Sequence, residues 1–63
     1  MRISLKAARV NKGLTQQEVG KALGVAKKTV GSWESGKSAP NAEKIDGLCA
    51  LYGCSYDDIQ WKA

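Results

Sequence analysis

Apolar residues along this chain recur every three or four positions, which is the spacing of helices. No stretch alternates apolar and polar residues for long, so strands are not indicated. The pattern predicts helices over about 4–12, 16–23, 27–35 and 42–52, followed by a last short helix that begins at Ser55. A glycine follows each of the first four, where it can take the left-handed conformation that ends a helix. We therefore expect an all-α domain of five short helices.

Polar residues that can cap helices stand where two of these helices begin. Thr15 and Glu18 have the spacing of a capping box, in which each side chain accepts a hydrogen bond from the other residue's backbone. Asn41 follows Pro40 and can cap the next helix. Ala26 has no side-chain oxygen to offer, so we expect the helix over 27–35 to start loosely.

The side chains expected in a single core take inward positions on their helices. They are Leu5, Ala8, Val19, Ala22, Leu23, Val25, Val30, Trp33, Ile45, Leu48, Cys49, Tyr52 and Ile59. Cys49 is placed there because cysteine is often a small buried hydrophobe. With no signal peptide, it and Cys54 should stay reduced. Two thiols without a histidine make a poor zinc site, so neither a metal nor a cofactor is predicted.

Length and charge narrow the possible functions. Sixty-three residues make one domain, expected to span 1–63, with little room for an enclosed catalytic cleft. Residues 1–40 hold eight basic and two acidic side chains, a net charge of +6, whereas residues 41–63 hold two basic and four acidic ones, a net charge of −2. This asymmetry favours a polyanionic partner, although charge alone fits an ordinary solvated surface equally well.

Membrane and secretion segments are not expected. No apolar run approaches the roughly 20 residues that span a bilayer. Residues 1–6 lack the apolar region of a signal peptide. We expect a cytoplasmic protein with no membrane partner and no small-molecule substrate.

Residues 16–35 have the composition that a helix-turn-helix requires. Two helices that cross steeply over a short turn need a small residue where they touch, which Gly20 supplies. The turn needs a residue that tolerates positive φ, which Gly24 supplies. The inward positions of both helices are apolar. No single feature is specific, but the whole set favours a helix-turn-helix over an unrelated helical bundle.

The sequence resembles the phage repressor and Cro-like helix-turn-helix family, also called the XRE family, from about residue 5 to residue 59. The resemblance is strongest in Leu-Thr-Gln-Gln-Glu at 14–18, the turn at Gly24, Val-Gly-Ser-Trp-Glu-Ser-Gly-Lys at 30–37, and Pro40. It implies a transcriptional regulator whose third helix lies in the major groove of double-stranded DNA. It also implies a homodimer on a pseudo-palindromic operator, and a monomer that pairs only on DNA remains an alternative.

The resemblance assigns roles to individual residues. Base-facing positions on the third helix match Lys27, Lys28 and Ser32. Phosphate-facing positions match Gln16, Gln17, Thr29, Lys37 and Ser38. Gln16 also matches a residue that braces the recognition helix. Arg9 and Glu34 match a partly buried ion pair between the first and third helices.

The two lysines that begin the third helix depart from the family pattern, which often has glutamine there. Lysine donates to guanine O6 and N7, but it pairs equally well with phosphate and then carries no sequence information. We expect Lys28 to read a guanine and Lys27 to be shared with phosphate. Whether either lysine reads a base stays open at this stage.

Other residues suit structural roles better than catalysis. Trp33 is expected in the core rather than as a platform for single strands. Three aromatic residues near the end of the chain suit core or subunit contacts: Tyr52, Tyr56 and Trp61. The paired acidic residues near 43–46 and 57–58 suit helix starts. The sequence has no histidine and no phosphate-binding glycine loop, so an enzyme is not expected. The main alternative is a protein-interaction module, such as an antirepressor or bridging factor, that retains the fold.

Overall fold

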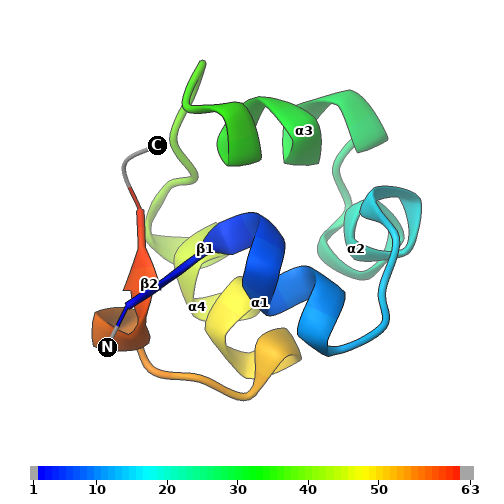
Figure 1. Ribbon diagram of the computed structural model, residues 1–63. Helices are drawn as coiled ribbons and strands as arrows, with labels where there is room; N and C mark the ends of the chain where they lie inside the picture. The colour runs from blue at the N-terminus through cyan, green and yellow to red at the C-terminus, as the bar shows by residue number, and fades with distance from the viewer. Residues whose placement is uncertain (1, 62–63) are drawn as a thin grey trace.

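A computed structural model describes residues 2–61 of the chain, and its architecture is mostly helical (Figure 1). In chain order the elements are β1 (Ile3–Ser4), α1 (Leu5–Asn11), α2 (Gln16–Leu23), α3 (Lys27–Ser35), α4 (Ala42–Tyr52), the 3₁₀ turn η1 (Tyr56–Asp58) and β2 (Ile59–Gln60). The four helices agree with the predicted ranges to within one residue at each end.

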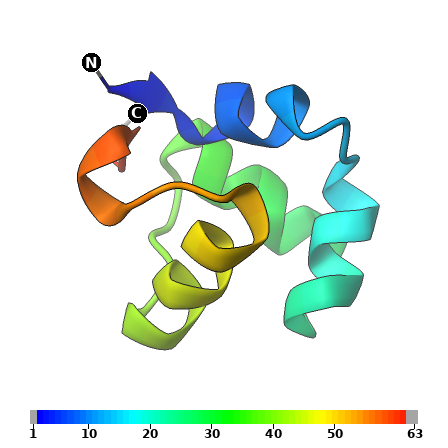
Figure 2. The ribbon, with the colours of Figure 1, turned by 90° about the horizontal axis from the view of Figure 1, so that it is seen from below.

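The prediction of a fifth α-helix beginning at Ser55 is wrong. The segment after Ser55 makes only the three-residue turn η1, within which Asp58 accepts hydrogen bonds from the Ser55 backbone and hydroxyl at 3.0 Å each. The chain then straightens into β2, which pairs in parallel with β1 in the register Ile3↔Ile59. Figure 2 shows these two ends of the chain side by side at one edge of the molecule. Two-residue strands are too short to leave an alternating pattern, so the sequence did not reveal them.

Local capping determines where the helices begin and end. The backbone N–H of Glu18 donates to Thr15 Oγ1 at 3.1 Å, and that of Thr15 donates to Glu18 Oε1 at 2.9 Å, which completes the predicted capping box. Asn41 accepts from the Lys44 backbone at 2.9 Å. Gly24, after α2, has a φ of 73°, the left-handed conformation that was expected. These contacts join residues close in sequence, which is why the sequence located the helix ends well.

A single core joins all four helices to β2. It consists of Leu5, Ala8, Val19, Val30, Trp33, Leu48, Tyr52 and Ile59, all of which were predicted. Leu23 and Val25 are partly buried against it. Ala22, however, is exposed, and Ile45 and Cys49 are only half-buried. The buried side of α2 is formed by Val19 and Gly20. Around the helix axis Ala22 and Gly20 lie on opposite sides of Val19, so Ala22 points away from the buried side. Within residues 2–61, no helix has the length and apolar character to cross a membrane.

Candidate nucleic-acid interface

The close approach of α2 to the start of α3 depends on Gly20. A Cβ atom at this position would lie 2.6 Å from the carbonyl oxygen of Val25, which is closer than real side chains come to backbone atoms. The carbonyl of Gly20 in turn accepts a hydrogen bond from the Val25 backbone at 2.9 Å. The absence of a side chain therefore lets the turn fold directly against α2 and sets how α3 crosses it.

Three polar side chains tie α1, α2 and α3 together. Arg9 Nε donates to Glu34 Oε2 at 2.7 Å, and Arg9 Nη2 donates to Oε1 at 3.3 Å. Gln16 Nε2 also donates to Glu34 Oε1, at 3.0 Å. The Arg9 and Glu34 side chains are only 11% and 5% exposed. The charges of Arg9 and Glu34 are thus largely removed from water, and each neutralises the other. We call Arg9, Gln16 and Glu34 the clamp, because their hydrogen bonds hold α3 in a defined orientation.

The clamp extends beyond these three side chains. Arg9 Nη1 donates to the carbonyl of Leu14 at 2.8 Å, which holds the loop between α1 and α2. The hydrogen bond to Glu34 raises the pKa of Arg9, while partial burial opposes that shift. Arg9 thus stays charged and satisfies both the carboxylate and the loop carbonyl.

The outer face of α3 is centred on Lys28. Val30 and Trp33 are buried at 1% and 6% exposure, which fixes the inward face of the helix. At 100° per residue, Lys28 and Ser35 lie opposite that face, with Ser32 beside them. Lys28 and Ser35 are exposed, and Ser32 is half-buried. Lys27 is exposed as well, but it lies nearer the edge of this face. In Figure 1, α3 runs along one margin of the molecule.

The loop after α3 is held by the end of that helix. Gly36 takes a left-handed conformation with a φ of 83°. The carbonyl of Ser32 accepts hydrogen bonds from the backbones of Lys37 at 3.0 Å and Ser38 at 3.4 Å. Both residues are exposed. The Lys37 ammonium group is therefore attached to a backbone that α3 itself positions.

A sequence profile for the helix-turn-helix family matches residues 5–59. The chain belongs to the helix-turn-helix family. The predicted resemblance to this class of DNA-binding domain is thereby confirmed. The matched segment includes α1 to α4, η1 and the first residue of β2.

Three relatives are similar to this helix-turn-helix chain. It is 31% identical to the transcriptional activator BcrR of Enterococcus faecalis over 87% of this chain and 27% of that protein. It is 32% identical to the antitoxin PezA of Streptococcus pneumoniae over 89% and 35% of the two chains. It is 35% identical to the cryptic phage CTXphi transcriptional repressor RstR of Vibrio cholerae over 78% and 44%. The chain thus matches less than half the length of each relative. No solved structure matches it significantly.

The other site residues predicted for this helix-turn-helix domain lie in two places. Gln16 and Gln17 begin α2, where Gln16 is half-buried by its contact with Glu34 and Gln17 is exposed. Thr29 is half-buried in the first turn of α3. Ala26 is the N-cap of α3, and its methyl group cannot accept a hydrogen bond, as expected.

Sequence reasoning missed two positions on the outer face of α3. Ser35 lies seven residues after Lys28 and thus on the same side of the helix. Gly31 is adjacent, and a Cβ there would lie 3.5 Å from Gln16 Nε2, an ordinary contact distance. Helical periodicity measured from Lys28 was the signal that would have identified both residues.

Proposed function

We propose that this protein is a sequence-specific regulator of transcription that places α3 in the major groove of double-stranded DNA. The observation that carries this proposal is the basic, solvent-facing side of α3, centred on Lys28 and held by the clamp of Arg9, Gln16 and Glu34. The major groove of DNA admits one α-helix. A protein that binds there gains affinity when its helix is held rigidly before binding, because less conformational entropy is then lost. Two relatives named as transcriptional regulators support the same function.

The proposed contacts fall into two groups. Lys28 and Ser32 face base edges, and Lys27 at the margin of the face is shared between a base and a phosphate. The remaining positions meet the phosphate backbone: Gln16, Gln17, Thr29, Lys37 and Ser38. In this arrangement Gln16 both braces Glu34 and approaches a phosphate.

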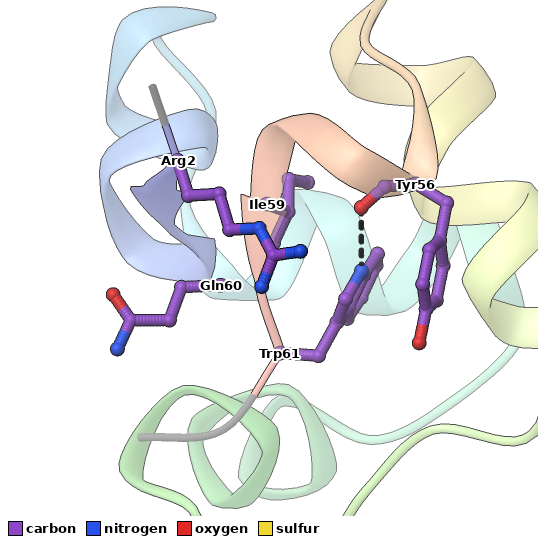
Figure 3. Close-up of a pocket in the computed structure, with 5 residues that line it drawn as sticks. All are labelled: Arg2, Tyr56, Ile59, Gln60 and Trp61. Carbon is purple, nitrogen blue, oxygen red and sulfur yellow. Dashed lines mark hydrogen bonds between the residues drawn. The ribbon is translucent and has the colours of Figure 1, made fainter.

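We further propose that two copies bind one pseudo-palindromic operator, with half-sites about 34–36 Å apart. Tyr52 does not belong to the joining surface, because it is 4% exposed. The remaining candidates are Tyr56, which is 56% exposed, and Trp61, whose ring stacks on it with centroids 5.4 Å apart. Figure 3 shows this pair beside a hollow of about 460 Å³ that Arg2, Ile59 and Gln60 also line. As part of this proposal we place the protein in the cytoplasm, where the DNA of its bacterial relatives lies.

The test is selection from random duplex DNA, followed by footprinting at two salt concentrations. We expect an enriched inverted repeat and a footprint over two half-sites, with affinity that falls as salt rises. A footprint over a single half-site would contradict pairing on DNA. Binding no stronger than to a scrambled duplex would contradict the function itself and favour a protein-interaction module that uses the Tyr56–Trp61 surface.

Two lysine variants separate base reading from phosphate contact. Lys28→Ala should weaken specific binding by about 1–3 kcal/mol and relax the preference at one position in each half-site. Lys37→Ala should weaken binding to all sequences alike and reduce the salt slope by about one. Lys12→Ala serves as the control because it also removes one positive charge. The Lys12 ammonium group lies near Gly53, and Figure 1 shows that the end of α4 lies away from α3. If Lys28→Ala lowered affinity for every sequence equally, Lys28 would be a phosphate contact.

A further inference from the structure

The two cysteines of the chain meet at the end of α4. The backbone N–H of Cys54 donates to the carbonyl of Cys49 at 3.1 Å, across Gly53, which has a φ of 66°. A hydrogen bond from a backbone N–H to the carbonyl five residues earlier is typical of a Schellman motif at a helix end. In this motif the side chains of the two bonded residues, here Cys49 and Cys54, commonly contact each other. The helix end thus brings together two thiols that lie five residues apart.

The backbone geometry is compatible with a disulfide. With standard bond lengths, a 3.1 Å bond between the Cys54 nitrogen and the Cys49 oxygen holds the two Cα atoms within roughly 7 Å of each other. Disulfides span about 4.4–6.8 Å between Cα atoms. Both cysteines are half-buried, so the side chains are sheltered but accessible to a small reagent. The pKa of the Cys49 thiol is raised, mainly by burial and to a smaller extent by the adjacent Cys54.

We propose that Cys49 and Cys54 form a dithiol site that a low-molecular-weight disulfide, such as glutathione disulfide, oxidises to an intramolecular disulfide without unfolding the protein. The thiolate of Cys54 attacks the small disulfide, forms a mixed disulfide and releases one small thiol. Cys49 then loses its proton to solvent and attacks Sγ of Cys54, and the second small thiol leaves. Two protein thiols are oxidised, and one small disulfide is reduced to two thiols.

The order of these steps is part of the proposal and rests on the burial of Cys49. Only a thiolate is nucleophilic, and the raised pKa of Cys49 makes it the poorer first attacker. After the mixed disulfide forms, proximity compensates for that low reactivity, because the helix end holds Cys49 against the sulfur it must attack.

The site is separate from the proposed DNA-reading surface. In Figure 1 the turn after α4 lies on the opposite side of the molecule from α3. A disulfide there joins α4 to the segment that carries η1 and β2. Since a bridge with native geometry restricts mainly the unfolded chain, we expect the oxidised protein to have a higher Tm than the reduced protein.

The experiment equilibrates the full chain with glutathione disulfide and glutathione, once folded and once unfolded in urea. Mass spectrometry after acid quenching then counts the hydrogens lost and the glutathione gained. We expect the folded chain to lose two hydrogens and retain no glutathione, with an equilibrium constant for ring closure on the order of tenfold above that in urea. Equal constants in the two states, stable glutathione adducts or disulfide-linked dimers would each overturn the proposal.

Two variants, checked for folding by circular dichroism, serve as controls. Cys49→Ser lacks the second thiol, so a stable mixed disulfide should accumulate at Cys54. The double variant Cys49→Ala, Ala50→Cys keeps two thiols but moves one to an exposed position outside the helix-end contact. It should carry glutathione adducts and close no ring in the folded state. Ring closure as favourable as in the parent would show that the helix end does not direct the reaction.

Discussion

Tyr52 has a buried hydroxyl that lacks a hydrogen-bond partner among residues 2–61. An unsatisfied buried polar group costs about 1–3 kcal/mol. We therefore predict that Tyr52→Phe keeps the packing of the ring and raises the free energy of unfolding by about 1 kcal/mol, as measured by urea denaturation. A loss of stability would instead mean that the hydroxyl is satisfied, for example by a water molecule beside the Arg9–Glu34 pair.

The same hydroxyl predicts a dependence of stability on alkaline pH. Burial, reinforced by the charge of Glu34, raises the pKa of Tyr52 to about 12, whereas an unfolded tyrosine titrates near 10. The unfolded state thus loses this proton first, so the contribution of Tyr52 is constant below about pH 10 and declines between about 10 and 12. At about 1.4 kcal/mol per unit, the full decline is about 3 kcal/mol. The difference in unfolding free energy between the parent and Tyr52→Phe should show it.

Two glycines in helices should respond oppositely to alanine. Within a helix, replacing glycine by alanine normally stabilises by about 1 kcal/mol. Gly31→Ala should show that gain, because its Cβ meets Gln16 at an ordinary distance of 3.5 Å. Gly20→Ala should instead destabilise by about 1–3 kcal/mol, because its Cβ would lie 2.6 Å from a backbone oxygen and force the turn to move.

Thermal melts of the two glycine variants check the contrast. Because the substitution is chemically identical in both, the difference in Tm isolates the close contact at the turn. A Gly20→Ala variant that melts at or above the parent temperature would show that α2 and α3 can separate without cost.

At the scale of the elements, the Arg9–Glu34 pair is the strongest polar link between α1 and α3. Removing one member should cost about 3–5 kcal/mol, because the other is left charged and nearly buried. Arg9→Met with Glu34→Leu should cost less than either change alone. A double-mutant cycle from urea unfolding measures this, and a coupling energy near zero would mean that the two charges act independently.

The elements differ in how well the sequence predicted them. α2 and α4 were located from caps and closing glycines, since those signals act within one helical turn. The β1–β2 pair was missed because its partners, Ile3 and Ile59, are at opposite ends of the chain. Ala22 was expected in the core from the pattern of α2 alone, but it is exposed, because the side of α2 that is covered depends on where α3 crosses it. The structure gives the positions of the residues assigned to DNA contacts, and the contacts themselves remain predictions.

At the scale of the whole molecule, stability depends on one small core. A 63-residue chain buries only about 60% of its unfolded surface, and removing a core tryptophan side chain costs about 3–5 kcal/mol. We predict that Trp33→Ala is largely unfolded at 37 °C, as circular dichroism would show. Trp61→Ala is the matched control: its ring is half-buried and stacks on exposed Tyr56, so the variant should remain helical. If both variants melted like the parent, Trp33 would not be a core residue.

The sequence by itself determined the helices, their caps, most of the core and membership in the helix-turn-helix family. These features depend on contacts between near neighbours or on the periodic placement of apolar residues, and both are present in the linear order of the chain. Only the tertiary structure decided the strand pair, the burial of Tyr52 without a hydrogen-bond partner and the bond from Gln16 to Glu34. The partners in that bond are 18 residues apart. The Arg9–Glu34 pair, whose members are 25 residues apart, was predicted from the family resemblance and not from any local pattern. Such contacts depend on how the helices cross, which is set by close packing at points such as Gly20 rather than by any local signal.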